Sequence, residues 1–327
     1  MDDLPDPLLH IQNLHVQLKS REGTVRAVEG VTVDIMPSQI VGIVGESGSG
    51  KSTTALSVIK LLPSTAIAMG KIFFDGSDLL GFSEKQMRSI RGSRISMIFQ
   101  DPTTYLNPVM KIGRQIGEAI RLHLKTDPKG TEQRVINGLR SVGIAQPDDV
   151  AHQYPHQLSG GMKQRTLIAM ALSCAPSLLI ADEPTTALDV TIQMQILNLV
   201  RDLVKKKLGI SVMLITHDLG VVAELCDRVY VMYAGKIAEE AKAEDLFEKP
   251  RHPYTSALLK SVLSITETRR LEAIEGEVPN LTNPPKGCRF HPRCPKAMDA
   301  CQTEDPSVHN FGNGHKVSCL LYQDSVR

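Results

Sequence analysis

The fold is decided by the stretch Gln39-Ile40-Val41-Gly42-Ile43-Val44-Gly45-Glu46-Ser47-Gly48-Ser49-Gly50-Lys51-Ser52-Thr53. An apolar run typical of a buried strand leads into a glycine-rich loop, and a helix is expected from there to about Leu62. Glycines let a backbone wrap closely around phosphate oxygens, and the N–H groups at a helix start favour anions. The stretch therefore predicts a phosphate-binding loop. A Gly/Ser-rich turn with a chance lysine is disfavoured by the flanking strand and helix.

A second apolar run, Leu178 to Ala181, ends in two acids, Asp182 and Glu183. Ligands of α/β sheets lie at such strand ends. We predict that Asp182 holds Mg²⁺ and that Glu183 orients or deprotonates an attacking water. A helix N-cap or a solvated turn is the alternative for Asp-Glu-Pro. With the phosphate loop, the two acids predict a nucleoside triphosphatase.

Strand and helix patterns alternate outward from these two motifs. Alternating apolar and polar residues predict strands at 8–18 and 31–35, and a short apolar run lies at 95–99. Further strands are predicted at 212–216 and 229–233, and an amphipathic helix over 189–206. Such alternation implies an α/β fold with a largely parallel, helix-covered sheet. Strand patterns vanish from about 101 to 175, which predicts a helical insertion.

Composition excludes several classes of protein. The 327 residues are 42% hydrophobic, which is enough for a large buried core. The net charge of +1 gives no reason to expect nucleic acid as a partner. No apolar run reaches the roughly 18 residues of a membrane span, and the acidic, proline-broken start is not a secretory signal. We expect a cytosolic protein of about two domains.

A second anion-binding cap is predicted at Ser159-Gly160-Gly161, where a strongly helical run begins. The chain has only one phosphate loop, so this cap is expected to serve a phosphate held by another subunit. An ordinary serine N-cap with glycine neighbours is the alternative.

The order of these motifs resembles that of ATP-binding cassette (ABC) ATPases. The motifs that carry the resemblance are Gly45 to Ser52, Leu158-Ser159-Gly160-Gly161-Met162, Leu178 to Glu183, Thr186-Ala187-Leu188-Asp189 and Ile215-Thr216-His217-Asp218. The resemblance implies a RecA-like core with an antiparallel β subdomain and a helical subdomain. It implies ATP and Mg²⁺ as ligands, bound by the loop residues 45–53 and by the Ser159 cap of the opposing subunit.

The same resemblance assigns roles to single residues. Lys51, Glu183, His217 and Gln100 match the catalytic positions, with His217 contacting the γ-phosphate. Gln100 would also join Ser52 and Asp182 as a ligand of Mg²⁺. It would transmit the conformational change that follows hydrolysis to a membrane partner. Asp189 matches an acid at the dimer interface.

Two positions depart from the family pattern. In the signature motif of the family, which matches Leu158 to Met162 here, many members have glutamine where this chain has Met162. No aromatic residue precedes the phosphate loop to stack on adenine. The base is therefore expected on an aliphatic or arginine surface near Leu18, Val25 and Arg26, or on a partner.

Four cysteines crowd the last part of the chain, in the spacing Cys288-x5-Cys294-x6-Cys301-x17-Cys319. In a cytosolic protein this suggests a metal rather than disulfides. Four thiolates suit a [4Fe–4S] cluster or Zn²⁺, and His291 and His315 are alternative ligands. Cys174 and Cys226 lie in apolar contexts and are expected in the core.

This tail resembles the C-terminal extension of dipeptide and oligopeptide importer ATPases (the Dpp/Opp/Nik group). The matching residues are Arg251-His252-Pro253-Tyr254-Thr255, Val278-Pro279 and Gly287-Cys288-Arg289-Phe290-x2-Arg293-Cys294. The resemblance implies a [4Fe–4S] cluster on the four cysteines, with zinc or free thiols as alternatives. It divides the chain into an ABC domain, 8–250, and an irregular extension, 251–327.

Together the resemblances imply the ATPase subunit of a bacterial importer for di- or oligopeptides. Its expected partners are two membrane permeases, a second, paralogous ATPase and an extracytoplasmic solute-binding protein. It would lie at the cytoplasmic face of the inner membrane. Nickel or another small solute as cargo, or a soluble ABC ATPase without a transporter, are the alternatives.

Overall fold

The computed structural model describes residues 6–21, 23–100, 102–184, 190–202, 209–262 and 274–323. The chain forms two compact units. The first unit contains Met1–Met36, Ile40–Gly81 and Ile215–Arg327, and the second contains Pro37–Gln39 and Phe82–Leu214. The predicted C-terminal extension therefore lies in the same unit as the phosphate loop.

An antiparallel sheet of the first unit has the strand order β2-β1-β4-β5. Its strands are β1 (Leu9–Ser20), β2 (Gly23–Ile35), β4 (Ala66–Phe74) and β5 (Ser77–Asp78). The side chains of β1 alternate between buried and exposed, with a register shift around Asn13, whose φ is 48°. One face of this sheet thus contributes to the core while the other meets solvent.

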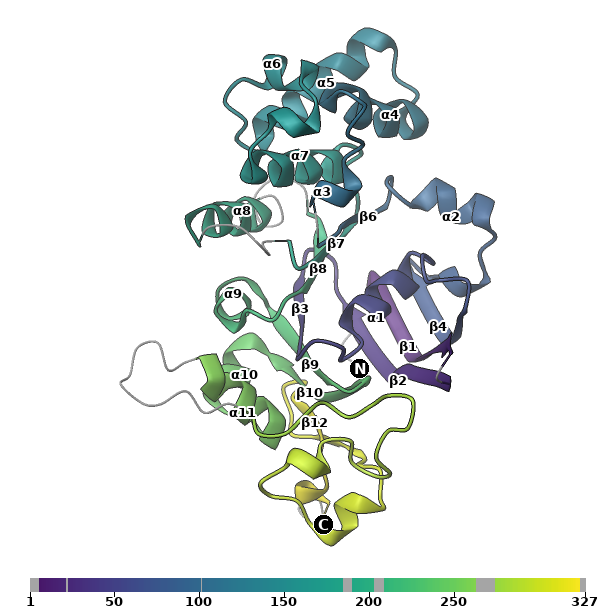
Figure 1. Ribbon diagram of the computed structural model, residues 1–327, viewed down its shortest axis with the longest axis vertical. Helices are drawn as coiled ribbons and strands as arrows, with labels where there is room; N and C mark the ends of the chain where they lie inside the picture. Colours follow the sequence, from purple (N-terminus) through teal and green to yellow (C-terminus); the bar gives the residue numbers. More distant parts are fainter. Residues whose placement is uncertain are drawn as a thin grey trace. The chain divides into compact units, whose positions relative to one another are not determined.

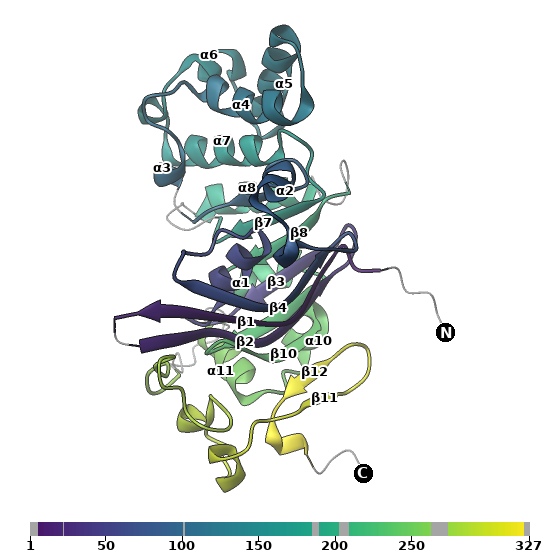
Figure 2. The same cartoon turned by 90° about the vertical axis from the view of Figure 1, so that its right-hand side faces the viewer.

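A second set of strands in the first unit runs in the order β11-β12-β10-β9-β3, of which β12, β10, β9 and β3 are labelled in Figure 1. These strands are β3 (Ile40–Val44), β9 (Arg228–Tyr233), β10 (Lys236–Lys242), β11 (Val308–Asn310) and β12 (Lys316–Ser318). β3 pairs with β9 in parallel, and all five of its residues are buried, as expected for a strand covered on both faces. β12 pairs antiparallel with β10, so the extension adds strands to this sheet (Figure 2).

Short helices complete the first unit. They are α1 (Lys51–Val58), α9 (Leu219–Leu225), α10 (Ala243–Glu248) and α11 (Pro253–Val262), with 3₁₀ turns at Leu79–Gly81, His291–Arg293, Asp299–Gln302 and Leu320–Tyr322. The predicted helix after the loop is real but ends at Val58, earlier than the expected Leu62.

The second unit contains three strands in the order β8-β7-β6. Its strands are β6 (Ile95–Ile98), β7 (Leu178–Asp182) and β8 (Ser211–Ile215), and α2 (Glu84–Ile90), α3 (Pro102–Tyr105) and α8 (Val190–Asp202) belong to the same unit. β6 and β7 pair in parallel, and β7 and β8 are buried along their whole length.

A group of helices forms the rest of the second unit (Figure 1). They are α4 (Ile112–Leu124), α5 (Pro128–Ser141), α6 (Pro147–His152) and α7 (Gly160–Leu172), with a 3₁₀ turn at Pro155–Gln157. Ile112, Ile116 and Ile120 of α4 are buried at the four-residue spacing of one helix face. The predicted helical insertion over 101–175 is thus matched by these helices.

Candidate nucleotide site

The loop between β3 and α1 has a backbone that only glycine fits at two points. Gly45 has φ +148°, and a Cβ there would collide with the carbonyl oxygen of Met232. Gly50 has φ +100°, and a Cβ would come within 2.5 Å of the Ala27 carbonyl oxygen. Both glycines let the loop lie directly against neighbouring backbone. Gly48 also has positive φ, at +75°, but it faces open space.

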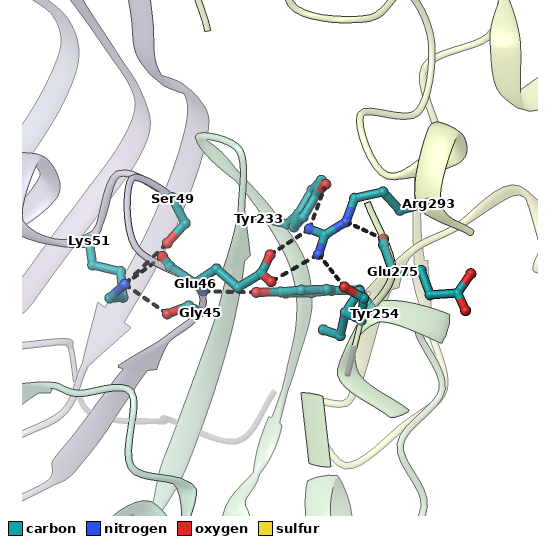
Figure 3. Close-up of polar contacts among 9 residues, drawn as sticks. Gly45, Glu46, Ser49, Lys51, Tyr233, Tyr254, Glu275 and Arg293 are labelled. Carbon is teal, nitrogen blue, oxygen red and sulfur yellow. Dashed lines mark hydrogen bonds and ion pairs between the residues drawn. The ribbon is translucent and has the colours of Figure 1, made fainter. Parts of the chain in front are cut away.

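Lys51 is folded back onto this loop. Its Nζ donates hydrogen bonds to the carbonyl oxygens of Gly45 and Glu46, both at 2.8 Å, and to Ser49 Oγ at 3.4 Å (Figure 3). The lysine is only 6% exposed. Its charge is thus held by backbone dipoles within reach of a phosphate at the loop.

The other predicted ligand positions of the loop have different exposures. Ser47, Gly48 and Ser52 are exposed, whereas Ser49 is buried. Thr53 is half-buried and its carbonyl accepts a hydrogen bond from Ser57 Oγ at 2.7 Å. Ser52, the predicted Mg²⁺ ligand of the loop, is therefore an exposed residue.

The predicted adenine surface lies on the β1–β2 hairpin. Leu18 and Val25 are cross-strand partners and both are half-exposed, while Arg26 is exposed. The Arg26 N–H donates to the Leu281 carbonyl oxygen at 2.9 Å. This pair forms an aliphatic surface in the same unit as the loop.

His217 is exposed and lies between β8 and α9. The following residue, Asp218, caps α9 by accepting from the N–H groups of Gly220 and Val221 at 2.9 and 3.3 Å. The Asp218 N–H in turn donates to Thr216 Oγ1 at 3.0 Å. The turn that carries the histidine is therefore fixed on both sides.

In the second unit, the structure brings together Gln100 and Glu183. Gln100 Nε2 donates a hydrogen bond to Glu183 Oε2 at 2.9 Å. Asp182 is 6% exposed at the end of β7, and Glu183 has a left-handed backbone with φ 46°. Asp182 is therefore the last residue of the strand, and Glu183 follows it with a left-handed backbone; their separate roles stay predictions.

The predicted signature cap begins α7. Ser159 is its N-cap, and its Oγ accepts from the Met162 N–H at 3.3 Å. Ser159 and Gly160 are exposed, and Gly160 would have no neighbour within 4 Å of a Cβ, whereas Gly161 is buried. Gln164 Nε2 of the same helix donates to the Pro184 carbonyl oxygen at 2.5 Å. The signature helix is therefore tied to the residue that follows Glu183.

The predicted interface acid, Asp189, lies outside the described residues, as does the rest of the Thr186–Asp189 motif. The roles of the remaining site residues stay predictions.

The sequence did not predict a side-chain group that joins the loop to the extension. Arg293 forms a two-pronged ion pair with Glu46, with Nη1–Oε2 at 2.6 Å and Nη2–Oε1 at 3.0 Å (Figure 3). The Glu46 N–H donates to Tyr254 Oη at 2.9 Å. The ion pair spans 247 residues of sequence, and no spacing pattern signals it.

The comparisons with known proteins agree with this geometry. Residues 28–186 match the ABC transporter family, and residues 238–301 match the C-terminal region of oligopeptide/dipeptide transporters. An oligopeptide transport ATP-binding protein of Bacillus subtilis is 49% identical over 320 residues, covering 97% of each chain. A dipeptide transport ATP-binding protein of the same organism is 50% identical over 319 residues, covering 97% of this chain and 95% of that protein.

The chain belongs to the ATP-binding subunits of peptide ABC transporters. The predicted ABC fold is confirmed by a solved ATP-binding cassette, a dimer in a post-hydrolysis state with ADP and phosphate. That structure is 26% identical, has a TM-score of 0.65 and covers 72% of this chain and 98% of its own. Among the described residues of this ABC ATPase, no helix is both long and apolar enough to cross a membrane.

Three of the four cysteines in the ABC subunit's extension have a raised pKa. Burial is the main cause that raises the pKa of Cys319 to about 11, and the nearby thiols of Cys288, Cys294 and Cys301 contribute to the same value. Burial also raises the pKa of Cys288 and of Cys294. Cysteine donors match iron or zinc, but within the described ranges no group of three or more His, Cys, Asp or Glu side chains is arranged to hold a metal ion. The residues as placed thus give no support to the predicted [4Fe–4S] or zinc centre.

The two remaining cysteines are core residues, as predicted. Cys174 and Cys226 are each 8% exposed. Cys226 Sγ would lie 3.0 Å from a Cβ at Gly42, so it packs directly behind the strand that leads into the phosphate loop. Burial raises the pKa of both thiols.

Proposed function

We propose that this subunit binds ATP at residues 45–53 and hydrolyses it to power the import of dipeptides and oligopeptides. The observation that carries the proposal is the hydrogen bond from Gln100 to Glu183, at 2.9 Å. This hydrogen bond joins Glu183, which is expected to activate water, to Gln100, which is expected to transmit conformational changes to a permease. The peptide cargo is supported by the names of the relatives, which are described as oligopeptide and dipeptide transport proteins.

Each residue of the proposed site has a distinct task. Lys51 exchanges its bonds to loop carbonyls for phosphate oxygens, and the loop amides bind the same oxygens. Glu183 orients the attacking water and accepts its proton, which contributes about 10²–10⁴ in rate. His217, on its capped turn, contacts the γ-phosphate.

The proposed magnesium ligands are Ser52, Gln100 and Asp182. All three present oxygen donors, which Mg²⁺ prefers. Gln100 donates its amide N–H to Glu183 and so keeps its amide oxygen for this role. When bound, Mg²⁺ would neutralise the phosphate charge that develops during transfer.

A second ATPase subunit is proposed because the residues at the N-terminus of α7 are exposed. Ser159 and Gly160 are exposed at a helix start, where a phosphate is favoured. The ATP would thus lie between residues 45–53 of one subunit and Ser159-Gly160-Gly161 of the other. A paralogous partner, giving a heterodimer, is proposed; a homodimer is the alternative.

The other parts of the assembly are proposals from the family. They are two membrane permeases and a solute-binding protein, with this subunit at the cytoplasmic face of the bacterial inner membrane. The division into an ABC domain over 8–250 and an extension over 251–327 is proposed on the same ground. Nickel or another small solute remains the alternative cargo.

The four-cysteine metal centre stays a prediction. Its support is the spacing of the four cysteines in the sequence. Anaerobic purification followed by iron and zinc analysis tests it. A brown protein with iron and visible absorption indicates the cluster, whereas a colourless zinc protein or a metal-free one contradicts it.

The function is tested by Glu183→Gln in the assembled transporter. We expect ATP binding to persist while turnover falls about 10²–10⁴-fold, because the water loses its base. Turnover near the wild-type rate would contradict the role of Glu183. Tagging the native chain and extracting membranes in mild detergent identifies the partners. Two permeases and a peptide-binding protein are expected, whereas a soluble dimer alone contradicts the transport function.

A further inference from the structure

The phosphate loop carries an acid close to where a triphosphate binds. Glu46 directly follows Gly45, and its own carbonyl oxygen accepts a hydrogen bond from Lys51 Nζ at 2.8 Å. Its side chain is 25% exposed and extends toward Arg293, whereas Lys51 lies on the other side of the loop backbone (Figure 3). An unpaired carboxylate here would repel the phosphates of ATP.

Arg293 is built to hold that acid in one position. Its side chain is 4% exposed, and all five N–H donors of the guanidinium have acceptors. Besides Glu46, the acceptors are the carbonyl oxygens of Glu275 and Ile274, at 2.9 and 3.1 Å, and Tyr233 Oη at 3.3 Å. A planar fork fixed this way orients a carboxylate better than a lysine would.

A second contact from the extension fixes the loop backbone itself. The Glu46 N–H donates to Tyr254 Oη at 2.9 Å. The Tyr254 ring lies against Tyr233 and Phe290, with centroids 4.6 and 5.4 Å away. Both the side chain and the amide of Glu46 are therefore held by residues of the extension, Arg293 and Tyr254.

We propose that Arg293 is a positioning residue of the nucleotide site, which neutralises Glu46 and holds it away from the bound triphosphate. The extension thereby sets the affinity of the loop for ATP. This inference rests on the proposed function, since it assigns a regulator to the same loop.

The test measures the Kd of the purified full chain for a fluorescent ATP analogue with Mg²⁺. Arg293→Ala leaves Glu46 charged and unpaired, so we expect the Kd to rise about tenfold, equal to about 1.4 kcal/mol. Arg293→Lys keeps the charge and should stay within about threefold of the wild type. Circular dichroism establishes that each variant is folded.

The decisive variant is the double substitution Arg293→Ala with Glu46→Gln. It removes the unpaired charge, so ATP affinity should return to within about threefold of the wild type. A merely structural loss would not be rescued by changing Glu46. The loss for ADP should be smaller than for ATP, because ADP carries less negative charge.

Arg289 provides a matched control from the same segment. Its side chain is also 4% exposed, and its Nη2 pairs with Glu29 Oε2 at 2.6 Å, while Nη1 donates to the Ala234 carbonyl oxygen. Glu29 is on β2, outside the phosphate loop. Arg289→Ala should therefore leave the Kd for ATP within about twofold of the wild type.

The outcomes separate the two proposals. A wild-type chain that binds no ATP overturns the proposed function itself. Wild-type binding with an unchanged Kd in Arg293→Ala overturns only the role of Arg293. A weakened Arg293→Ala that Glu46→Gln does not rescue, or an equal loss in Arg289→Ala, also overturns it.

Discussion

His252 should make the stability of the first unit fall as the pH falls. The residue is 3% exposed, and its Nδ1 accepts a hydrogen bond from the Tyr254 N–H at 3.0 Å. Burial lowers its pKa from 6.5 to about 4, offset in part by a hydrogen bond to the Ser318 backbone. Protonation would place a proton on the nitrogen that accepts from Tyr254, so the folded state resists it.

The sign and size follow from linkage. Between pH 6.5 and 4 the unfolded chain binds a proton at His252 that the folded chain does not. The free energy of unfolding therefore decreases as the pH is lowered through this range. A difference of about 2.5 pKa units corresponds to about 3 kcal/mol, present above pH 6.5 and lost by pH 4. The slope contributed by this residue reaches about 1.4 kcal/mol per pH unit.

Urea unfolding at a series of pH values from 7.5 to 4.5 (about 3 units) measures this slope. The chain has six tyrosines and no tryptophan, so tyrosine emission follows the transition. His252→Asn retains an acceptor for the Tyr254 N–H but has no ring to protonate. Its free energy of unfolding should depend less on pH, by up to about 1.4 kcal/mol per unit.

His156→Asn is the control, because His156 is exposed and folding does not remove its ring from water. This variant should keep the wild-type slope. Equal slopes for the wild type and His252→Asn would refute the reasoning, since His252 would then titrate alike in both states.

Two further predictions concern the phosphate loop and its neighbouring turn. Gly45→Ala should destabilise the first unit by about 2–4 kcal/mol and abolish ATP binding, because the new Cβ collides with the Met232 carbonyl oxygen. Gly48→Ala places its Cβ in open space, so it should cost only about 1 kcal/mol, from the positive φ at that position. Equal effects in thermal unfolding would contradict the steric argument. Asp218→Ala removes the cap of α9 and should cost about 1 kcal/mol while lowering the ATPase rate through His217. A variant with wild-type stability and rate would show that the cap does not fix this turn.

The nucleotide site was largely predictable because its chemistry is local. Phosphate recognition needs closely spaced glycines and a lysine, so residues 45–53 carry their signal in one window. The apolar runs of β3 and β7 are confirmed by the structure as buried. The acids at the end of β7 follow the same logic. Local patterns of this kind require no knowledge of the fold.

The strands of the extension were not predictable in the same way. β11 and β12 have three residues each, too short for a periodic pattern, and the sequence suggested only an irregular stretch. The strand that they join, β10, precedes the extension and contains Glu239 and Glu240, which read as polar although both are buried. These acids have partners far along the chain, such as Lys316, whose Nζ lies 3.1 Å from Glu240 Oε2. Pairing of this kind leaves no mark in the local sequence.

The buried Glu239 explains why the extension docks where Arg293 can reach the phosphate loop. Glu239 is 0% exposed, and its carboxylate accepts from the Arg251 and His252 N–H groups at 2.8 and 2.9 Å. His315 Nε2 lies 2.7 Å from the same carboxylate. All three partners come from the region after β10, and a buried carboxylate without them would be strongly destabilising. The acid on β10 therefore selects one docked position, in which Tyr254 and Arg293 meet Glu46, so a buried charge remote from the nucleotide helps to determine the geometry of the loop that binds it.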